Sequence, residues 1–325
     1  MRRREFITLV VSSAATLSQM DARAQQSSPV IGILGSSTAR DYSPMIAAFR
    51  KGLSEAGYLE GKNVGFEYAW ADDHYDRLPA LATKLAERQV NLILAAATPS
   101  ALAAKSATTT IPIVFAIGGD PVSTGLVTSL NSPGGNVTGA AHINVDTAPK
   151  RLELLHELLP GRNSLGLLTN SANPLTQAVE SGVKAAASAL GVRLTTFHAS
   201  TDEEINATFN DAAGSVAGIV IGTDPLFTSH ATTLGAKSLE YKLPAIYQYR
   251  DFVVAGGAMS YGGDISDSYY HAGIYAGRIL NGEKPANLAV QLSTRVELII
   301  NLKAAKALGL EVPVALVARA DEVIE

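Results

Sequence analysis

The stretch Pro29-Val30-Ile31-Gly32-Ile33-Leu34 is a short, uninterrupted apolar run, and Gly35-Ser36-Ser37-Thr38 follows it directly. Such a run predicts a strand that is buried on both faces, as the strands of parallel sheets are. The next segment, residues 42–57, carries its apolar residues on one stripe and ends in a glycine, which predicts an amphipathic helix. A strand, a small polar loop and a helix therefore form the first unit of the chain.

The same unit recurs along the chain. Further strands are expected at residues 64–69, 90–95, 113–116, 165–168, 192–197, 217–221, 245–249, 258–261 and 296–301, and further helices at residues 76–89, 99–107, 175–190, 203–212, 227–241, 266–280 and 302–308. Strands that alternate with helices of this length favour parallel sheets with right-handed crossovers. The units are too many for one small sheet, so we expect two doubly wound α/β lobes.

The expected boundary between the lobes is the Pro/Gly/Asn-rich stretch 131–138, just ahead of residues 142–147. The strands and helices after residue 258 exceed what the second sheet needs. A chain that crosses again between the lobes would account for this extra material.

Residues 1–24 predict an export signal. Arg2-Arg3-Arg4 forms a charged start, residues 6–17 a mildly apolar middle, and Ala22-Arg23-Ala24 a small-x-small exit, with cleavage expected after Ala24. The apolar part is shorter than the about 20 residues that span a bilayer, and the paired arginines fit the twin-arginine type of signal. The alternative is a basic, disordered N-terminus on a cytosolic protein.

The composition limits which cellular compartment and which classes of function the protein can have. The 325-residue chain has no cysteine, which excludes disulfides, thiolate metal sites, a thiol nucleophile and a lipid anchor on cysteine. We therefore expect a protein of the periplasm without a lipid anchor. Hydrophobic residues make up 47% and charged residues 17% of the chain, as in a folded protein, and the net charge is −4. A net acidic chain without Lys/Arg runs is a poor nucleic-acid binder.

The motifs of common enzymes are missing from the sequence. It contains no Gly-x-Ser-x-Gly elbow after a strand, no phosphate-binding loop, no dinucleotide fingerprint after the first strand and no His-Glu-x-x-His. The six histidines are scattered along the chain. We therefore predict no catalytic residue, no metal site and no cofactor.

Small polar residues recur just after the expected strands, where open α/β sheets bind their ligands. Helix N-termini at these places offer free N–H groups to a carboxylate. The candidate binding residues of these loops are Ser36, Ser37, Thr98, Pro99, Ser100, Gly119, Asp120, Asn170, Ser171, Asn173 and Asp224. The alternative is that they are ordinary helix caps and turns.

Larger side chains near the same strand ends are candidates to shape the pocket. The aromatic candidates for stacking on a flat ligand are Trp70, Phe227, Tyr247, Tyr249 and Tyr261. The candidate partners for a charged ligand end are Asp120, Asp224, Arg250 and Asp264. Core packing is the alternative for the aromatic residues.

Five segments carry a family pattern: residues 245–262, 297–310 and 316–324, the last reading Leu-Val-Ala-Arg-Ala-Asp-Glu-Val-Ile, and the earlier segments 76–79 and 120–127. In these segments the chain resembles the ABC-transporter substrate-binding proteins of the tryptophan/tyrosine-type group. It implies a type I periplasmic-binding-protein fold, with two Rossmann-like lobes joined by three crossovers and a ligand in the cleft. The lobes would comprise residues 29–142 with 264–290, and residues 143–263 with 291–325.

The resemblance also implies which residues contact the ligand and what the protein does. Ligand contacts would come from Ser36, Ser37, Thr98 to Ser100, Asp120, Asn170, Asn173, Asp224, Tyr247 and Asp264. The protein would be a monomer that closes on a small molecule, an amino acid or an aromatic or carboxylate compound, without covalent chemistry. It would then deliver that molecule to an ABC permease and ATPase in the inner membrane. The competing readings are an exported α/β hydrolase and a ligand-sensing module for a membrane receptor.

Overall fold

Two separate β-sheets frame the molecule in the computed structural model, which describes residues 28–325; the expected export signal lies outside the described residues. The first sheet contains β1 (Val30–Gly35), β2 (Gly65–Trp70), β3 (Leu92–Ala96), β4 (Ile113–Ile117), β5 (Val137–His142) and β11 (Gln291–Ser293). The second contains β6 (Ser164–Thr169), β7 (Arg193–His198), β8 (Ile219–Ile221), β9 (Ala245–Tyr247), β10 (Met259–Gly263), β12 (Val296–Asn301) and β13 (Glu322–Ile324). Their strand orders are β11-β5-β4-β3-β1-β2 and β13-β12-β10-β9-β8-β6-β7.

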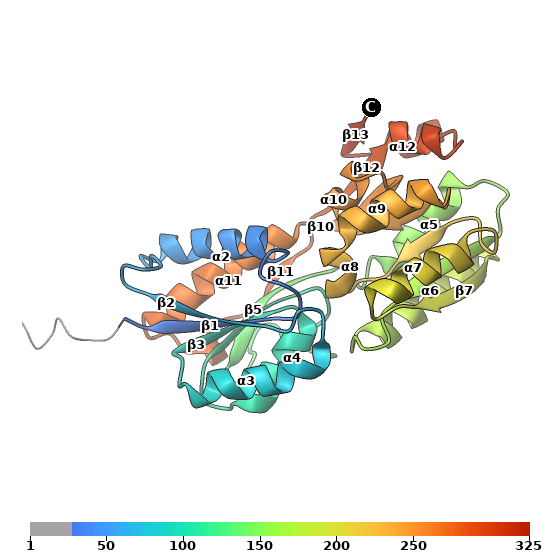
Figure 1. Cartoon of the computed structure of the whole chain (residues 1–325). Helices are drawn as coiled ribbons and strands as arrows, with labels where there is room; N and C mark the ends of the chain where they lie inside the picture. The colour runs from blue at the N-terminus through green and yellow to red at the C-terminus, as the bar shows by residue number, and fades with distance from the viewer. Residues whose placement is uncertain (1–27) are drawn as a thin grey trace, which may run out of the picture.

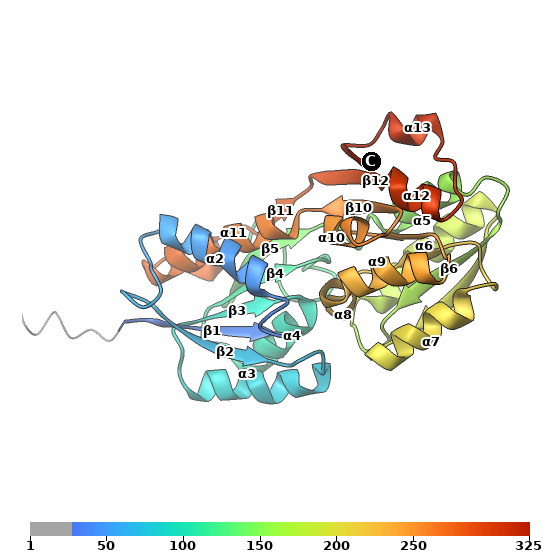
Figure 2. The same cartoon turned by 45° about the horizontal axis from the view of Figure 1, so that its top comes forward.

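Helices cover both faces of each sheet. On the first sheet these are α2 (Ser43–Glu55) and α11 (Ile265–Leu280) on one face, and α3 (Leu78–Glu87) and α4 (Thr98–Ala107) on the other (Figure 1). The helices of the second sheet are α5 (Ala148–Leu158), α6 (Thr176–Leu190), α7 (Asp202–Ala212), α8 (Pro225–Ser229), α9 (Ala231–Glu240), α10 (Arg250–Val254), α12 (Leu302–Ala307) and α13 (Val314–Val317). The predicted pair of doubly wound α/β lobes is confirmed, and Figure 2 shows them side by side.

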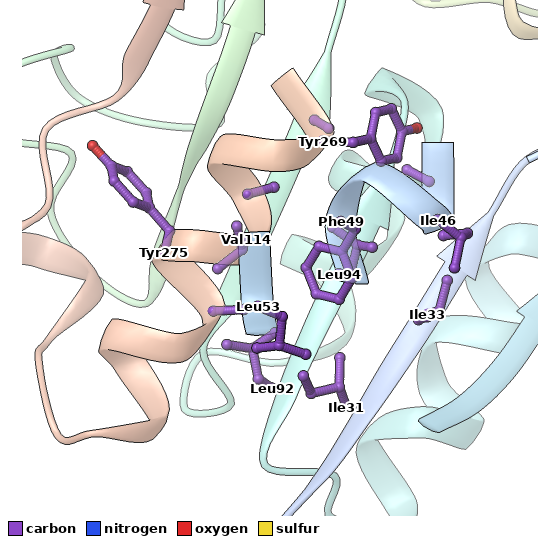
Figure 3. Close-up of a cluster of buried hydrophobic side chains, with 14 of the residues drawn as sticks. Ile31, Ile33, Ile46, Phe49, Leu53, Leu92, Leu94, Val114, Tyr269 and Tyr275 are labelled. Atoms are coloured by element: carbon purple, nitrogen blue, oxygen red, sulfur yellow. The ribbon is translucent and has the colours of Figure 1, made fainter. Parts of the chain in front are cut away.

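The core between the first sheet and the helices α2 and α11 shows how α11, although late in the sequence, joins the first lobe. Side chains of β1, β3 and β4 meet those of α2 and α11 there, among them Phe49 and Tyr269 (Figure 3). The two helices approach closely because glycines lie between them. A Cβ atom on Gly273 would lie 2.1 Å from the carbonyl oxygen of Phe49. Any larger residue at that position would force α11 away from α2.

The chain passes three times between the lobes: after β5, between β10 and α11, and between β11 and β12. The last passage differs from the prediction, which assigned residues 291–325 to the second lobe. Gln291 pairs with Ala140 of β5, so residues 291–293 complete the first sheet. The second-lobe part resumes at β12.

The stretch 131–138, predicted as the boundary, runs into β5, and the crossover comes later, at residues 143–147. Strand β5 and helix α5 were both absent from the prediction. The strand is hard to recognise because small residues fill it. Gly139 packs so tightly that a Cβ atom would lie 2.2 Å from the carbonyl oxygen of Phe115. Close packing against β4 thus replaces the usual apolar pattern.

Two further expectations need correction. The sheets were predicted to be parallel, but β12 runs antiparallel to β10, with Met259 opposite Ile300. β12 enters directly from β11 of the other lobe, without the helical crossover that a parallel pair requires. The helix expected at residues 227–241 is divided into α8 and α9. No helix within residues 28–325 combines the length and the apolar character needed to cross a membrane.

Candidate functional site

A cleft lies between the two lobes, at the carboxyl ends of the parallel strands, and its empty space, open solvent included, is about 510 Å³. Small-molecule sites commonly form in such clefts between domains. The lining side chains of the first lobe are Ser37, Asp41, Tyr42, Met45, Ala97, Thr98, Pro99, Ala116, Gly118, His142, Ile265 and Tyr269. Those of the second lobe are Asn173, Leu175, Thr223, Asp224, Pro225, Thr228, Ser229, Gln248 and Tyr249.

The N-terminus of α4 forms one part of the first-lobe wall. No side chain caps this helix, and the residue before it, Ala97, has φ +78°. A non-glycine residue in this region is strained, which is a feature of functional sites. The hydroxyls of Thr98 and Ser100 are buried and have no hydrogen-bond partner among the described residues. Buried hydroxyls normally have partners, so this helix end is suited to bind a carboxylate.

His142, at the end of β5, is a second part of the first-lobe wall. Its Nδ1 lies 3.2 Å from the Ser268 hydroxyl, and its Nε2 lies 3.2 Å from the hydroxyl of Tyr249 in the other lobe. Burial lowers the pKa of His142 to about 4. The imidazole is therefore neutral at pH 7 and hydrogen-bonds across the cleft without adding charge to it.

Aromatic rings form the third part of the first-lobe wall. Tyr42 lines the cleft, and its ring stacks on Trp70 with centroids 5.5 Å apart. On another side Tyr269 lies 6.3 Å from Tyr42, also by ring centroid. The Tyr42 hydroxyl is held 3.0 Å from the Ser36 hydroxyl. The ring thus has a fixed orientation, and Trp70 supports it from behind.

Asp224 is the centre of the second-lobe wall. Its carboxylate accepts hydrogen bonds from the side chains of Asn173 (2.6 Å), Asn170 (3.2 Å) and Tyr75 (3.0 Å), and from the backbone N–H of Leu226 (2.8 Å). Burial raises the pKa of Asp224 to about 6, against these donors. The carboxylate holds together the loops that follow β6 and β8.

Arg151 lies behind the same wall and is fully buried. Its guanidinium donates to the carbonyls of Asn144 (2.8 Å) and Tyr261 (3.1 Å) and to the hydroxyl of Thr223 (3.1 Å). Burial lowers its pKa to about 10, so it remains charged at pH 7. Arg151 therefore ties a cleft loop to residues beside two of the crossovers.

The cleft brings together six of the residues predicted from the sequence. They are Ser37, Thr98, Pro99, Asn173, Asp224 and Tyr249. Two others stand directly behind them, because Asn170 bonds to Asp224 and Ser36 bonds to Tyr42. Gly119 lies next to the lining residue Gly118 and against Leu175 of the other lobe, where a Cβ atom would lie 2.6 Å from the leucine side chain.

The remaining polar candidates do not line this cleft. Ser100 lies in the buried first turn of α4, and Ser171 is exposed. Asp120 is exposed and accepts from the Val122 N–H, and Asp264 caps α11 beside a neighbouring cavity. Arg250 pairs with Glu322 at 2.7 Å. Asp120 and Asp264 thus serve as turn and cap residues, and Arg250 serves in an ion pair.

The aromatic candidates other than Tyr249 also lie away from the cleft. Phe227 and Tyr247 are fully buried in the core of the second lobe. Trp70 supports Tyr42, and Tyr261 packs at the edge of another core cluster. All four side chains pack within their own lobe, although their positions are at or near strand ends.

Several cleft residues were not predicted from the sequence. The polar and aromatic ones among them are Asp41, Tyr42, His142, Thr223, Thr228, Ser229, Gln248 and Tyr269. Thr223 immediately precedes the predicted Asp224, so the loop was identified and the residue was not. His142 carried no signal, because β5 itself was not recognised. Within residues 28–325 no group of three or more His, Asp or Glu side chains lies close enough to hold a metal ion.

The sequence model of the family described as "ABC transporter substrate binding protein" matches residues 41–324. This chain belongs to that family. A curated relative, a tyrosine-binding protein of Clostridioides difficile, is 30% identical over 264 residues, which cover 81% of this chain and 76% of the relative. The family is a class of solute-binding proteins rather than enzymes, as the sequence indicated.

Two solved relatives differ in how well they superpose on this chain. The ABC domain of Streptococcus pneumonia in complex with L-Trp is 27% identical and has a TM-score of 0.82, covering 92% of this chain and all of its own. The ligand-free, open structure of a substrate-binding protein from Clostridium difficile is 29% identical and has a TM-score of 0.61, covering 91% and 99%. Identity is similar in both, but this chain superposes better on the L-Trp complex.

Proposed function

We propose that this protein captures a small molecule with a carboxylate, of the amino-acid or aromatic acid class, and releases it unchanged. The observation that carries the proposal is the uncapped N-terminus of α4, where the buried hydroxyls of Thr98 and Ser100 have no partner among the described residues. A carboxylate there would receive hydrogen bonds from the Thr98 hydroxyl, which lines the cleft, and from free backbone N–H groups. Charge-assisted hydrogen bonds of this kind are about twice as strong as neutral ones.

The walls of the cleft favour an amino acid within that class. The rings of Tyr42, Tyr249 and Tyr269 offer apolar surface to a side chain. The carboxylates of Asp41 and Asp224 line the cleft and would attract an ammonium group. The relatives named for tyrosine and solved with L-Trp support the same class.

In this proposal the protein serves an ABC importer. The closed form would deliver its ligand to a membrane permease and its ATPase, as a monomeric periplasmic protein. Residues 1–24 would direct export by the twin-arginine route and be removed after Ala24. Mass spectrometry of the protein from a periplasmic fraction would then find Gln25 at the N-terminus. The full-length chain in the cytoplasm would contradict the export proposal.

A thermal-shift screen of the purified protein tests the ligand class. The panel contains L-tryptophan, L-tyrosine, other amino acids and aromatic carboxylates. A ligand at 100 times its dissociation constant should add about 2.7 kcal/mol to the free energy of unfolding. Chromatography of the recovered ligand should find it unaltered. Turnover, or stabilisation only by compounds without a carboxylate, would overturn the proposal.

A further inference from the structure

One hydroxyl of the first lobe lies in the cap of a second-lobe helix. Tyr75 lies in the short 3₁₀ turn Tyr75–Arg77 that follows β2. Its hydroxyl donates to Oδ1 of Asp224 at 3.0 Å and accepts from the backbone N–H of Leu226 at 3.1 Å. Asp224 and Leu226 form the N-terminal cap of α8. The first lobe thus contributes to a helix cap of the second lobe.

The first-lobe side of this contact is fixed to the cleft. Asp72 and Asp73 have φ values of 52° and 64°, so two consecutive non-glycine residues adopt the left-handed region. The backbone N–H of Asp73 donates to the Ser36 carbonyl at 2.9 Å, and the Ser37 hydroxyl donates to the Asp73 carboxylate. Ser37 lines the cleft. The loop that presents Tyr75 is therefore bonded to a loop that would face the ligand.

The second-lobe side is fixed to the cleft as well. Asp224 receives hydrogen bonds from Asn170 and Asn173, and Asn173 and Asp224 both line the cleft. The Tyr75 hydroxyl consequently joins the central residue of the second-lobe wall to the first lobe.

Other hydrogen bonds across the cleft are differently placed. Tyr249 meets His142 at 3.2 Å, but the same hydroxyl is held by Asn144 of the first crossover. Ser229 and Asp73 are 3.5 Å apart, which is long for a hydrogen bond. Tyr75 makes a bond to a charged acceptor from a loop that has no part in a crossover. Opening the lobes would break that bond.

We propose that the Tyr75 hydroxyl is a latch between the lobes, which sets the population of the closed arrangement and, through it, the residence time of the ligand. The inference rests on the proposed function, because residence time presupposes a ligand in the cleft. A hydrogen bond to a charged group contributes enough to change the ratio of closed to open molecules about 10- to 100-fold. Tyr75 acts through Asp224 and the lobe geometry, as a positioning residue.

Distance measurements on Tyr75→Phe test the latch. The chain has no cysteine, so spin labels can be attached at single cysteines introduced in place of Lys84 on α3 and Asn210 on α7, both exposed. Pulsed electron paramagnetic resonance then gives the proportions of short and long interlobe distances. We expect Y75F to lower the ratio of short to long distances about 10- to 100-fold, without a loss of secondary structure by circular dichroism.

The matched control is Tyr58→Phe, whose hydroxyl bonds to Asn281 within the first lobe at 3.1 Å. It should leave the distance distribution unchanged. Equal distributions for wild type and Y75F, in ligand-free samples and in samples titrated with L-tryptophan, would overturn the latch. So would an equal shift in Y58F and Y75F.

Stopped-flow kinetics with L-tryptophan separate the latch from the proposed function. Y75F should raise the dissociation rate about 10- to 100-fold and change the association rate little, because a latch acts after encounter. An equal effect on both rates would contradict the latch. If no carboxylate compound of the panel binds the wild type, the proposed ligand class is wrong, while the ligand-free distance measurement still decides on the latch.

Discussion

The first-lobe wall of the cleft and the helix turn behind it keep two buried hydroxyls without partners among the described residues, whereas the second-lobe wall surrounds its central carboxylate with four hydrogen-bond donors. Thr98 and Ser100 have bonding capacity that no described residue uses. Asp224 has nearly exhausted its own on Asn170, Asn173, Tyr75 and Leu226. In our proposal Thr98 meets the ligand, whereas Asp224 holds its loops in place. The two walls also differ in the direction of their pKa shifts: burial lowers the pKa of His142 in the first-lobe wall and raises the pKa of Asp224 in the second-lobe wall.

The largest expected effect concerns His142 of the first lobe. Burial lowers its pKa to about 4, so the folded protein stays neutral there while the unfolded chain takes up a proton below about pH 6.5. His142 therefore contributes stability above about pH 6.5, and this is lost as the pH falls to about 4. The loss amounts to about 3 kcal/mol.

Urea unfolding of the wild type and of His142→Gln across this range measures the free energy of unfolding of each. As the pH falls, the variant should become more stable relative to the wild type. His74→Gln, at an exposed position, is the control. A constant difference at every pH would contradict the buried neutral imidazole.

Asp224 of the second lobe should show the opposite sign. Its pKa is raised to about 6 by burial, so the folded protein binds a proton more tightly than the unfolded chain. The stability from protonation is fully present below about pH 4 and is lost as the pH rises through about 6. The free energy of unfolding changes by about 3 kcal/mol, slightly less than for His142.

Asp224→Asn should abolish this dependence, whereas Asp264→Asn at the exposed cap of α11 should retain it. Parallel pH profiles for wild type and D224N in urea unfolding would show that burial does not shift this carboxyl. His142 and Asp224 change the stability in opposite directions as the pH falls. The free energy of unfolding of the wild type should therefore depend little on pH between about 4 and 6.5, whereas that of each variant should change.

A smaller effect is expected for the hydroxyls of the first-lobe wall. The double variant Thr98→Val and Ser100→Ala should weaken binding of a carboxylate ligand about 10- to 100-fold, because it removes the bond from Thr98 to a charged group. Stability should be unchanged or slightly higher, since neither hydroxyl has a protein partner to lose. Calorimetry with the panel's best ligand and thermal unfolding measure the two quantities.

The control for this variant is Ser106→Ala on the same helix, whose hydroxyl bonds to the Leu102 carbonyl at 3.0 Å. A fall in stability without a change in affinity would show that the two hydroxyls stabilise the folded protein and do not bind the ligand.

The smallest effect is expected at the support of the first-lobe wall. Trp70→Phe should weaken binding by about 0.5–1.5 kcal/mol, the typical value of a stacked pair, because the Tyr42 ring loses its backing. Trp70 is the only tryptophan, so its fluorescence should change when L-tyrosine binds. Excitation at wavelengths that tyrosine does not absorb isolates this signal. Unchanged emission at saturation would contradict the contact between Tyr42 and the ligand.

The sequence predicted the fold wherever periodicity was strong. The apolar run at residues 30–34 and the amphipathic helix after it were found within a residue or two. β5 was missed because its sequence, Val-Thr-Gly-Ala-Ala-His, has small residues where β4 packs against it. The antiparallel direction of β12 depends on a passage between lobes that no local pattern records.

The site was predicted where a loop position implies a function, as at Thr98 and Asp224. It was missed where a side chain reaches the cleft from a helix or from the residue before one, as with Tyr269 on α11 and Tyr42 before α2. Tyr247, at the end of β9, and Phe227, on α8, illustrate the converse, because their side chains are buried in the core. Loop position can be read from the chain, but the face to which a side chain points cannot.

The comparison of L-tryptophan with tryptamine by titration calorimetry tests most directly whether the α4 N-terminus holds the ligand's carboxylate. The two compounds share the indole ring and the amino group and differ only in that carboxylate. The account predicts that L-tryptophan binds and that tryptamine binds about 100-fold more weakly or not at all. Equal affinity for the two compounds would contradict it.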